Sequence, residues 1–175
     1  VDMGYKVGAE IGVETGVFSE ELLRVGLKVY SIDPWLHTTT WAYQKSENRM
    51  DQIYNGAVKQ LSKYENSVII RKTSMDAIED FADESLDFVY IDGNHEFRYF
   101  AEDIYEWTKK VRKGGIVSGH DYFTPVQKKI CAVQPILHAY TGWFRINTWY
   151  VLGALRRNPP GSIRERFRSW FWIRE

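Results

Sequence analysis

The chain has few of the features that mark a disulfide-bonded, secreted or membrane-spanning protein. Its 175 residues contain one cysteine, Cys131, which excludes an intrachain disulfide and a zinc site built from several cysteines. One cysteine suits a reducing compartment, so we expect a cytoplasmic protein. No apolar run approaches the roughly 20 residues that cross a bilayer. No signal peptide is recognised, and because the first residue is Val1 rather than Met we expect residues to precede it.

Net charge is also lacking, since 23 basic residues balance 23 acidic ones. A protein with no net charge has no general attraction to nucleic acid, and we expect no nucleic-acid partner. The balance hides an asymmetry, because residues 156–175 contain six Arg and only two Glu. The length fits one domain. We therefore expect a domain over residues 1–155 and a basic, aromatic tail over 156–175.

Apolar runs and helical repeats alternate along the chain. Strands are expected at Lys6–Val13, Lys28–Ile32, Val68–Ile70, Leu86–Ile91 and Gly115–Ser118. Helices are expected over 18–25, 46–64, a short stretch capped by Ser74 or Asp76, 97–111, and a segment from Thr124-Pro125 to Pro135. Two last strands, Trp143–Ile146 and Thr148–Leu152, are expected to meet at Asn147. This order predicts an α/β fold, a three-layer αβα sandwich around a mostly parallel sheet of about seven strands with an antiparallel edge strand.

Polar residues follow the expected strands. Ligands of such sheets bind beyond the carboxyl ends of the strands, so these residues are predicted to cluster. The first group is Glu10-Ile-Gly12-Val-Glu14-Thr-Gly16. Its spacing is not that of a phosphate-binding P-loop, and it lacks the third glycine of the dinucleotide fingerprint. It is either a ligand-binding loop or an ordinary strand-to-helix turn.

Asp33 follows the second strand, 17 residues after Gly16. A carboxylate at this point can accept both ribose hydroxyls of an adenosine ligand. The alternative is a turn former before Pro34. Together with the glycine loop, the spacing favours a nucleoside ligand.

Five segments in this order resemble the motifs of class I S-adenosylmethionine-dependent methyltransferases, most closely the small macrocin- and catechol-type O-methyltransferases. They are Glu-Ile-Gly-Val-Glu-Thr-Gly, Ser-Ile-Asp33-Pro-Trp, Lys-Thr-Ser74-Met-Asp76, Phe-Val-Tyr-Ile-Asp92-Gly-Asn-His95 and Gly-Gly-Ile-Val-Ser-Gly-His120-Asp121-Tyr. The resemblance covers roughly residues 5–152 and implies a Rossmann-like fold with S-adenosylmethionine as cofactor. The family usually has Gly where Glu14 stands.

The resemblance also implies roles for single residues. Glu10 would face the methionine amino group, Gly12 and Gly16 would pass under the cofactor, and Asp33 would hold the ribose. Other residues implied in cofactor binding are Glu14, Pro34, Trp35 (packing on the adenosine), Ser74, Met75 and Asp76 (bordering the adenine) and Asp92.

Two carboxylates and an imidazole at neighbouring strand ends could hold one divalent cation, with Asp92, His120 and Asp121 as ligands. Oxygen-rich ligands favour Mg²⁺, and an added imidazole shifts the preference towards Mn²⁺. In the catechol-type relatives, acids at the Asp92 and Asp121 positions look like metal ligands, and an acid often stands at the position of His120. His95, with Asp92, is the expected catalytic group, because imidazole has an ordinary pKa near ~6.5 and can accept the acceptor's proton. Helix capping is the alternative for both residues.

The expected reaction is methyl transfer to a hydroxyl of a small molecule or saccharide. An aromatic stretch, His37 to Trp41 with Tyr43, has the composition of a lid. Tyr122, Phe123, Trp143 and Trp149 either line an acceptor pocket or pack in the core. Two alternatives are a nicotinamide-dependent oxidoreductase, which the missing third glycine disfavours, and a cofactor-binding protein without catalysis.

In the tail, Ile163, Phe167, Trp170 and Phe171 recur at helical spacing among arginines. Such a helix could lie on an anionic membrane surface. Docking on the domain or a homodimer contact is the favoured interpretation.

Overall fold

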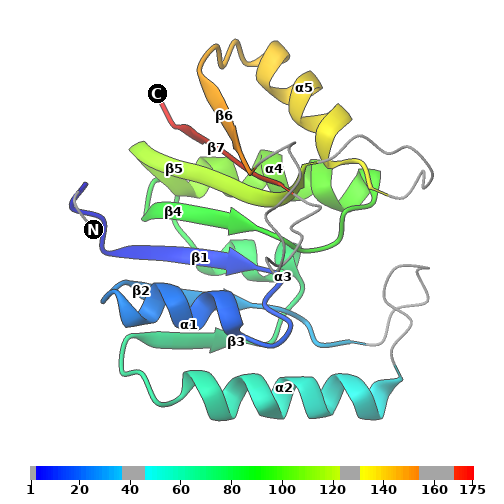
Figure 1. Ribbon diagram of the computed structural model, residues 1–175. Coiled ribbons are helices and arrows are strands. Elements are labelled where there is room, and N and C mark those ends of the chain that lie inside the picture. The colour runs from blue at the N-terminus through cyan, green and yellow to red at the C-terminus, as the bar shows by residue number, and fades with distance from the viewer. Residues whose placement is uncertain (1–2, 37–45, 123–130, 154–167) are drawn as a thin grey trace, which may run out of the picture.

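A seven-stranded sheet runs through the molecule in the order β3-β2-β1-β4-β5-β7-β6 (Figure 1). The computed structural model describes all residues except 1–2, 37–45, 123–130 and 154–167. The strands are β1 (Val7–Ile11), β2 (Lys28–Ile32), β3 (Ser67–Ile70), β4 (Leu86–Ile91), β5 (Val111–Tyr122), β6 (Trp149–Leu152) and β7 (Arg168–Ile173). The first five pair in parallel, whereas β7 is antiparallel to both β5 and β6. This confirms the predicted α/β class and strand count.

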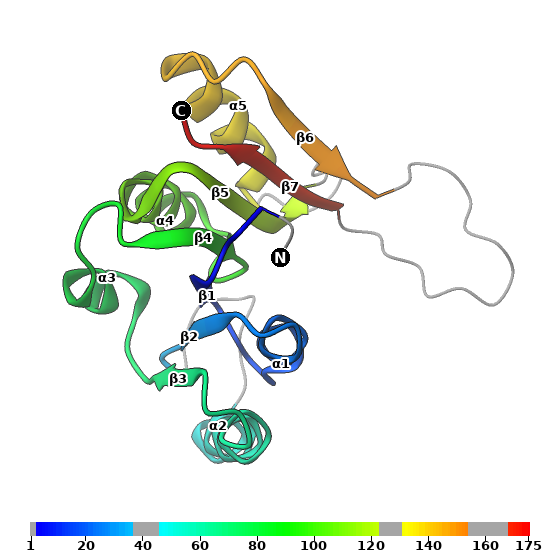
Figure 2. The same ribbon diagram turned by 90° about the vertical axis from the view of Figure 1, so that its left-hand side faces the viewer.

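Helices cover both faces of the sheet (Figure 2). On one face lie α1 (Val17–Arg24) and α2 (Glu47–Leu61). On the other lie α3 (Ser74–Ala77) with a following 3₁₀ turn (Ile78–Asp80), α4 (Phe97–Lys110) and α5 (Val133–Trp143). Each connection between consecutive parallel strands therefore carries a helix back over the sheet, which is what parallel pairing requires. None of the described helices is long and apolar enough to cross a bilayer.

Each face has its own buried core. Under α4 and α5 the core includes Phe100, Trp107 and Trp170, and under α1 and α2 it includes Leu23, Trp35 and Leu61. Phe100, Ile104 and Trp107 share the buried stripe of α4, as their spacing predicted. The two cores pack on opposite faces of the sheet and so fix where the strand ends lie.

Local polar signals fix where helices begin. Ser46 caps α2 by accepting the backbone N–H of Arg49. The cap of α3 is Thr73, whose side chain accepts the N–H of Asp76. The prediction of Ser74 or Asp76 as this cap was wrong by one residue or more. Ser74 instead directs its hydroxyl into the protein, as described below.

The C-terminal segment is the main departure from the sequence prediction. The prediction of a helix through Trp170 and Phe171 was wrong, because Arg168–Ile173 forms the strand β7. It is inserted between β5 and β6, with Gly119 opposite Trp170 on one side and Val151 on the other. Part of the tail thus belongs to the same sheet as residues 7–152. The remainder of the predicted tail helix lies outside the described residues.

The predicted hairpin around Asn147 was also wrong. Trp143 ends α5, and the antiparallel partner of β6 is β7 rather than residues 143–146. Pro135 does not end a helix but lies in the first turn of α5, where a missing N–H costs nothing. Thr124 and Pro125, where that helix was expected to begin, lie outside the described residues.

Candidate functional site

The loop after β1 packs directly against the loop after β4. Gly12 has φ +89°, and a Cβ placed there would lie 2.2 Å from the backbone oxygen of Asp92. Its N–H donates to the carbonyl of Ile32 at the end of β2 (2.9 Å). A side chain at Gly12 would therefore push three strand ends apart. Gly16, with φ +83°, is the residue from which α1 starts.

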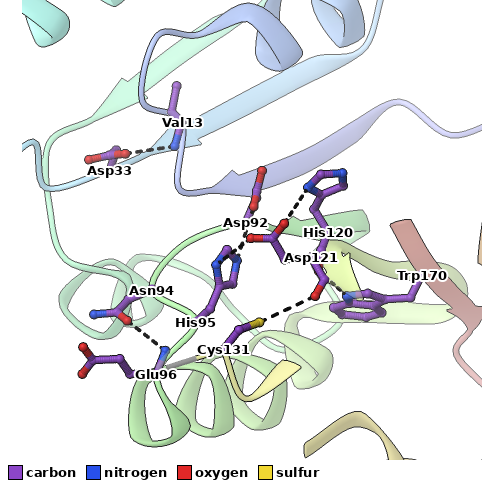
Figure 3. Close-up of polar contacts among 10 residues, drawn as sticks. All are labelled: Val13, Asp33, Asp92, Asn94, His95, Glu96, His120, Asp121, Cys131 and Trp170. Atoms are coloured by element: carbon purple, nitrogen blue, oxygen red, sulfur yellow. Dashed lines mark hydrogen bonds and ion pairs between the residues drawn. The ribbon is translucent and has the colours of Figure 1, made fainter. Parts of the chain in front are cut away.

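The Asp33 carboxylate holds this loop in shape. Oδ2 accepts the backbone N–H of Val13 at 3.0 Å (Figure 3). It also accepts the N–H of Glu14 at 3.0 Å, and Oδ1 accepts the N–H of Trp35 at 2.7 Å. Burial raises the pKa of Asp33, while these backbone hydrogen bonds oppose the rise. Each carboxylate oxygen offers two lone pairs, so capacity remains for a hydroxyl group. Asp33, the residue predicted to bind the ribose, thus also holds the glycine loop in its conformation.

Two residues of this region adopt left-handed backbone conformations that favour glycine. Glu14 has φ +47°, which explains why the resembling family usually carries Gly there. Trp35 has φ +43° and is 1% exposed, and its indole N–H donates to the carbonyl of Glu14 at 2.8 Å. Its ring packs on Tyr54 in the core. A buried ring offers no free face to adenosine, so the geometry contradicts the predicted packing role of Trp35. Pro34, between Asp33 and Trp35, is half-buried.

Glu10 lies beneath the loop in a buried polar cluster. Its carboxyl group accepts the hydroxyl of Ser19 in α1, which is also 2.6 Å from the hydroxyl of Ser31 in β2. Burial raises the pKa of Glu10 to about 8, and nearby Asp92 and Asp33 add to that rise, while the Ser19 hydrogen bond opposes it. Through these hydroxyl groups the Glu10 side chain of β1 is linked to Ser19 of α1 and Ser31 of β2.

The side chains of the three residues predicted to border the adenine have different surroundings in the structure. Ser74 faces α4, where its Oγ donates to the Asp103 carboxylate and accepts the indole N–H of Trp107 at 2.7 Å. Asp76 is exposed, and its carboxylate accepts the hydroxyl of Thr73 at 2.6 Å. Met75 is half-buried against the core under α4. The Ser74 hydroxyl is therefore already committed to protein partners.

His95 lies between two carboxylates at the ends of β4 and β5 (Figure 3). Its Nδ1 is 3.0 Å from Asp121 Oδ2, and its Nε2 is 3.3 Å from Asp92 Oδ1. Nε2 is buried and the Asp92 contact lacks hydrogen-bond geometry. Potential ligand atoms of Asp92, His95 and Asp121 all lie within 4.8 Å of one another. Of the strand-end groups predicted to cluster, those that follow β4 and β5 meet here.

The membership of this cluster differs from the prediction in one residue. His95, and not His120, completes the set with Asp92 and Asp121. His120 lies beyond Asp121, with Nδ1 at 3.4 Å from Asp121 Oδ1. The reason is a β-bulge, since three steps from Gly119 to Tyr122 on β5 oppose two steps on β7. Asp121 takes φ +57° in the bulge, which turns its carboxylate towards His95.

The protonation of His95 follows from its neighbours. Burial alone would lower the pKa of His95, but its contacts with the carboxylates of Asp121 and Asp92 outweigh it and raise that pKa to about 9. For Asp121, burial favours the neutral form, yet contacts with His120 and His95 win and hold its pKa well below the ordinary value. In this geometry His95 is an imidazolium between carboxylates. That does not favour the predicted role of His95 as a proton acceptor.

Of the aromatic residues considered for an acceptor pocket, two are packing residues. Tyr122 is 7% exposed, and its ring and that of Trp149 pack together with His138. Trp143 is 82% exposed at the end of α5. Phe123 and the predicted lid, His37 to Trp41 with Tyr43, lie outside the described residues.

Sequence reasoning missed Asp103, which is 4% exposed on α4. A signal for it was present, because Asp103 falls on the apolar stripe between Phe100 and Trp107. A carboxylate at a core position needs a hydrogen-bonding reason to be there.

Comparisons with known proteins agree with this architecture. A family model described as a methyltransferase domain matches residues 6–122. An uncharacterised protein, y4gI of Sinorhizobium fredii, is 25% identical over 126 residues, which is 71% of this chain but 12% of that protein. The chain therefore spans only a small part of the curated relative that it matches.

Solved structures show the same fold at low identity. The O-methyltransferase TomG of Streptomyces achromogenes superposes with a TM-score of 0.67 at 12% identity, covering 99% of this chain and 75% of TomG. The N-methyltransferase NodS of Bradyrhizobium japonicum gives 0.64 at 12% identity, covering 97% of this chain and 86% of NodS. One fold thus serves both oxygen and nitrogen acceptors. With the sheet order, the strand-end cluster and a family match over most of its length, the chain belongs to the methyltransferase domain family.

Proposed function

We propose that this chain is an S-adenosylmethionine-dependent methyltransferase that acts on a hydroxyl group of a small molecule or saccharide. The observation that supports it most is the position of the Asp92–His95–Asp121 cluster. Asp92 follows β4, and its backbone oxygen contacts the glycine loop that follows β1. A cofactor on that loop would lie beside side chains able to bind a polar acceptor.

The cofactor side of the proposal depends on the loops after β1 and β2. Asp33 fixes the loop through the N–H groups of Val13, Glu14 and Trp35 and keeps one lone pair on Oδ1 for a ribose hydroxyl. Bound S-adenosylmethionine supplies a methyl group on a sulfonium, which needs no activation by the protein. The protein's part is alignment, because positioning an acceptor in line can contribute several orders of magnitude in rate.

On the acceptor side, Asp92 is the group that we assign to bind the acceptor hydroxyl. A hydroxyl that donates to Asp92 is oriented for attack, and the Asp92 carboxylate accepts its proton as the oxygen–methyl bond forms and the carbon–sulfur bond breaks. His95 holds Asp92 and Asp121 together as their cationic neighbour. This assignment retains both predicted catalytic residues but gives His95 an orienting role.

The cluster also fits a divalent cation. Two carboxylates and an imidazole with a buried Nε2 outside any hydrogen bond form a donor set that suits Mn²⁺ or Mg²⁺. Asp92, Asp121 and the imidazole of His95, which must release its proton to bind a metal, would hold the ion, and it would supply Lewis-acid polarisation of the acceptor oxygen. His120 remains next to Asp121 as an outer neighbour.

A direct experiment has two stages. Calorimetric titration with S-adenosylmethionine tests cofactor binding, and methyl transfer from labelled cofactor is then screened against sugars and phenols, with Mn²⁺, with Mg²⁺ and with EDTA. We expect transfer to a hydroxyl acceptor that Asp92→Asn abolishes and Asp80→Asn, an exposed acid paired with Lys72, leaves intact. Lack of cofactor binding would overturn the proposal. Binding without transfer would support the non-catalytic alternative, and methylation of amines alone would reassign the acceptor.

A further inference from the structure

A buried carboxylate joins the two loops that frame the proposed cofactor site. Asp103 lies in the middle of α4 and is 4% exposed. Its Oδ1 accepts the hydroxyl of Ser74, the first residue of α3. Its Oδ2 lies 3.5 Å from where a Cβ on Gly93 would be, directly beside the turn that carries Asp92. One side chain thus hydrogen-bonds to the segment after β3 and lies beside the turn after β4.

Trp107 completes the network. Its indole N–H donates to Ser74 Oγ at 2.7 Å, so this hydroxyl accepts from one α4 side chain and donates to another. Trp107 is fully buried and Asp103 nearly so. A hydroxyl with two buried partners has one orientation, because any rotation leaves an unsatisfied polar group.

Burying the carboxyl group of Asp103 in this network costs folding free energy that an apolar side chain would not cost. Burial raises the pKa of Asp103 to about 7, while the Ser74 hydrogen bond and nearby His95 oppose the rise. An apolar residue would fill a core position of α4 without that cost. The hydrogen bonds of Asp103 do what apolar packing alone would not do, because they hold α3 at a fixed distance from the turn after β4.

We propose that Asp103 is a positioning residue for the cofactor: acting through Ser74, it sets the start of α3 against the Asp92–Gly93 turn so that the adenine and methionine ends of the ligand bind together. This inference rests on the proposed function, because it assumes that S-adenosylmethionine binds along these loops. Asp103 itself does not touch the ligand. The Ser74 hydroxyl, held by protein partners, acts through the backbone of α3 rather than as a hydrogen-bond donor to adenine.

The test compares four variants: Asp103→Ala, Asp103→Asn, Ser74→Ala and the double variant Asp103→Ala/Ser74→Ala. Titration calorimetry gives the dissociation constant of S-adenosylmethionine, and urea unfolding without ligand gives stability. We expect Asp103→Ala to weaken cofactor binding about tenfold, the loss of one charge-assisted hydrogen bond. Asp103→Asn, which keeps an acceptor oxygen for Ser74, should recover most of the affinity. The double variant should bind no worse than Asp103→Ala alone, because both changes break the same contact.

Asp80→Asn, an exposed acid in the 3₁₀ turn after α3, is the matched control and should bind like the wild type. Unchanged affinity in Asp103→Ala, with lower stability, would overturn the inference and leave Asp103 a packing residue. Additive losses in the double variant would also overturn it, since Asp103 and Ser74 would then act separately. If the wild type itself does not bind S-adenosylmethionine, the proposed function fails first, and that result is seen before any variant is compared.

Discussion

His95 Nδ1 lies 3.0 Å from Asp121 Oδ2, which links the loop before α4 to the bulged end of β5. The same loop is fixed on its other side, where the His95 carbonyl accepts the N–H of Ala132 at 2.8 Å. The imidazole therefore lies on a short, tethered segment between β4 and α4. Its place between the carboxylates is a property of the fold.

Replacing His95 by Ala should destabilise the free protein. The change leaves Asp92 and Asp121 facing each other without a cationic neighbour, and we expect a loss of about 2 kcal/mol in the free energy of unfolding. Urea unfolding measures it. His138→Ala, which removes an imidazole from a Tyr122 contact instead, is the comparison for loss of packing. A His95→Ala variant as stable as the wild type would show that the two carboxylates do not need the imidazole.

Divalent cations should stabilise the protein through the same cluster. At a hundredfold excess over its dissociation constant, Mn²⁺ should add about 2.7 kcal/mol. Thermal unfolding with and without Mn²⁺ measures this, and Asp92→Asn should lose most of the increase. Asp80→Asn should keep it. An equal increase in all three proteins would place the ion elsewhere.

Stability should fall as the pH rises through the neutral range because of Glu10. In the unfolded chain this carboxyl loses its proton near its ordinary pKa of 4.5, whereas burial in the fold raises that pKa to about 8. Between these values the folded state binds the extra proton, so the free energy of unfolding decreases with pH by up to about 1.4 kcal/mol per unit. Glu10→Gln should flatten the slope between pH 5 and 8 in urea unfolding. Asp103, whose raised pKa is about 7, and His95, whose pKa is raised from 6.5 to about 9, add slopes of the same sign that the variant keeps. A slope unchanged by Glu10→Gln would contradict the assignment.

Glu14→Gly should stabilise the protein, because Glu14 holds φ +47° and glycine adopts this conformation without a Cβ clash. We expect a gain of up to about 1 kcal/mol. Glu21→Gly within α1 is the opposite control and should cost about 1 kcal/mol. Chemical denaturation of both variants gives the comparison, and a loss at both positions would mean that the side chain of Glu14 matters more than its backbone.

Trp170→Ala should be among the most destabilising substitutions. Trp170 is fully buried in β7 and donates its indole N–H to the carbonyl of His120 at 3.0 Å. Removal of such a side chain costs about 3–5 kcal/mol. Trp143→Ala, at a residue that is 82% exposed, should change stability by less than about 0.5 kcal/mol. Similar effects at both positions would argue against the insertion of β7 in the sheet.

The sequence was informative where a single local pattern decides the structure. The 3-4-3-4 spacing after Phe97 predicted α4, and the polar residues after β1, β2, β4 and β5 predicted which side chains meet. It failed at β7 because the spacing of Phe167, Trp170 and Phe171 also suits a helix, and only the unpaired edges of β5 and β6 select a strand. The exchange of His95 for His120 in the cluster depends on a bulge, which is set by pairing with β7 and has no local signal.

The roles of single residues were harder to predict than their location. Trp35 has an aromatic ring beside Asp33, as a nucleoside site would need, but the core under α2 takes up that ring. Ser74 was expected to meet the ligand, but Asp103 and Trp107, 29 and 33 residues later, orient it inward. Such contacts depend on how α3 and α4 pack, which no short motif encodes.

The insertion of β7 between β5 and β6 also affects the order in which the protein can be made. In the described sheet, β6 pairs only with β7, although it is synthesised first. During translation β6 therefore lacks its hydrogen-bonding partner strand until residues 168–173 have left the ribosome. The half of the sheet that supports Asp121 is completed after the other half, so a nascent chain stalled before β7 would have the loops after β1 and β2 and lack the strand that pairs with the bulged end of β5.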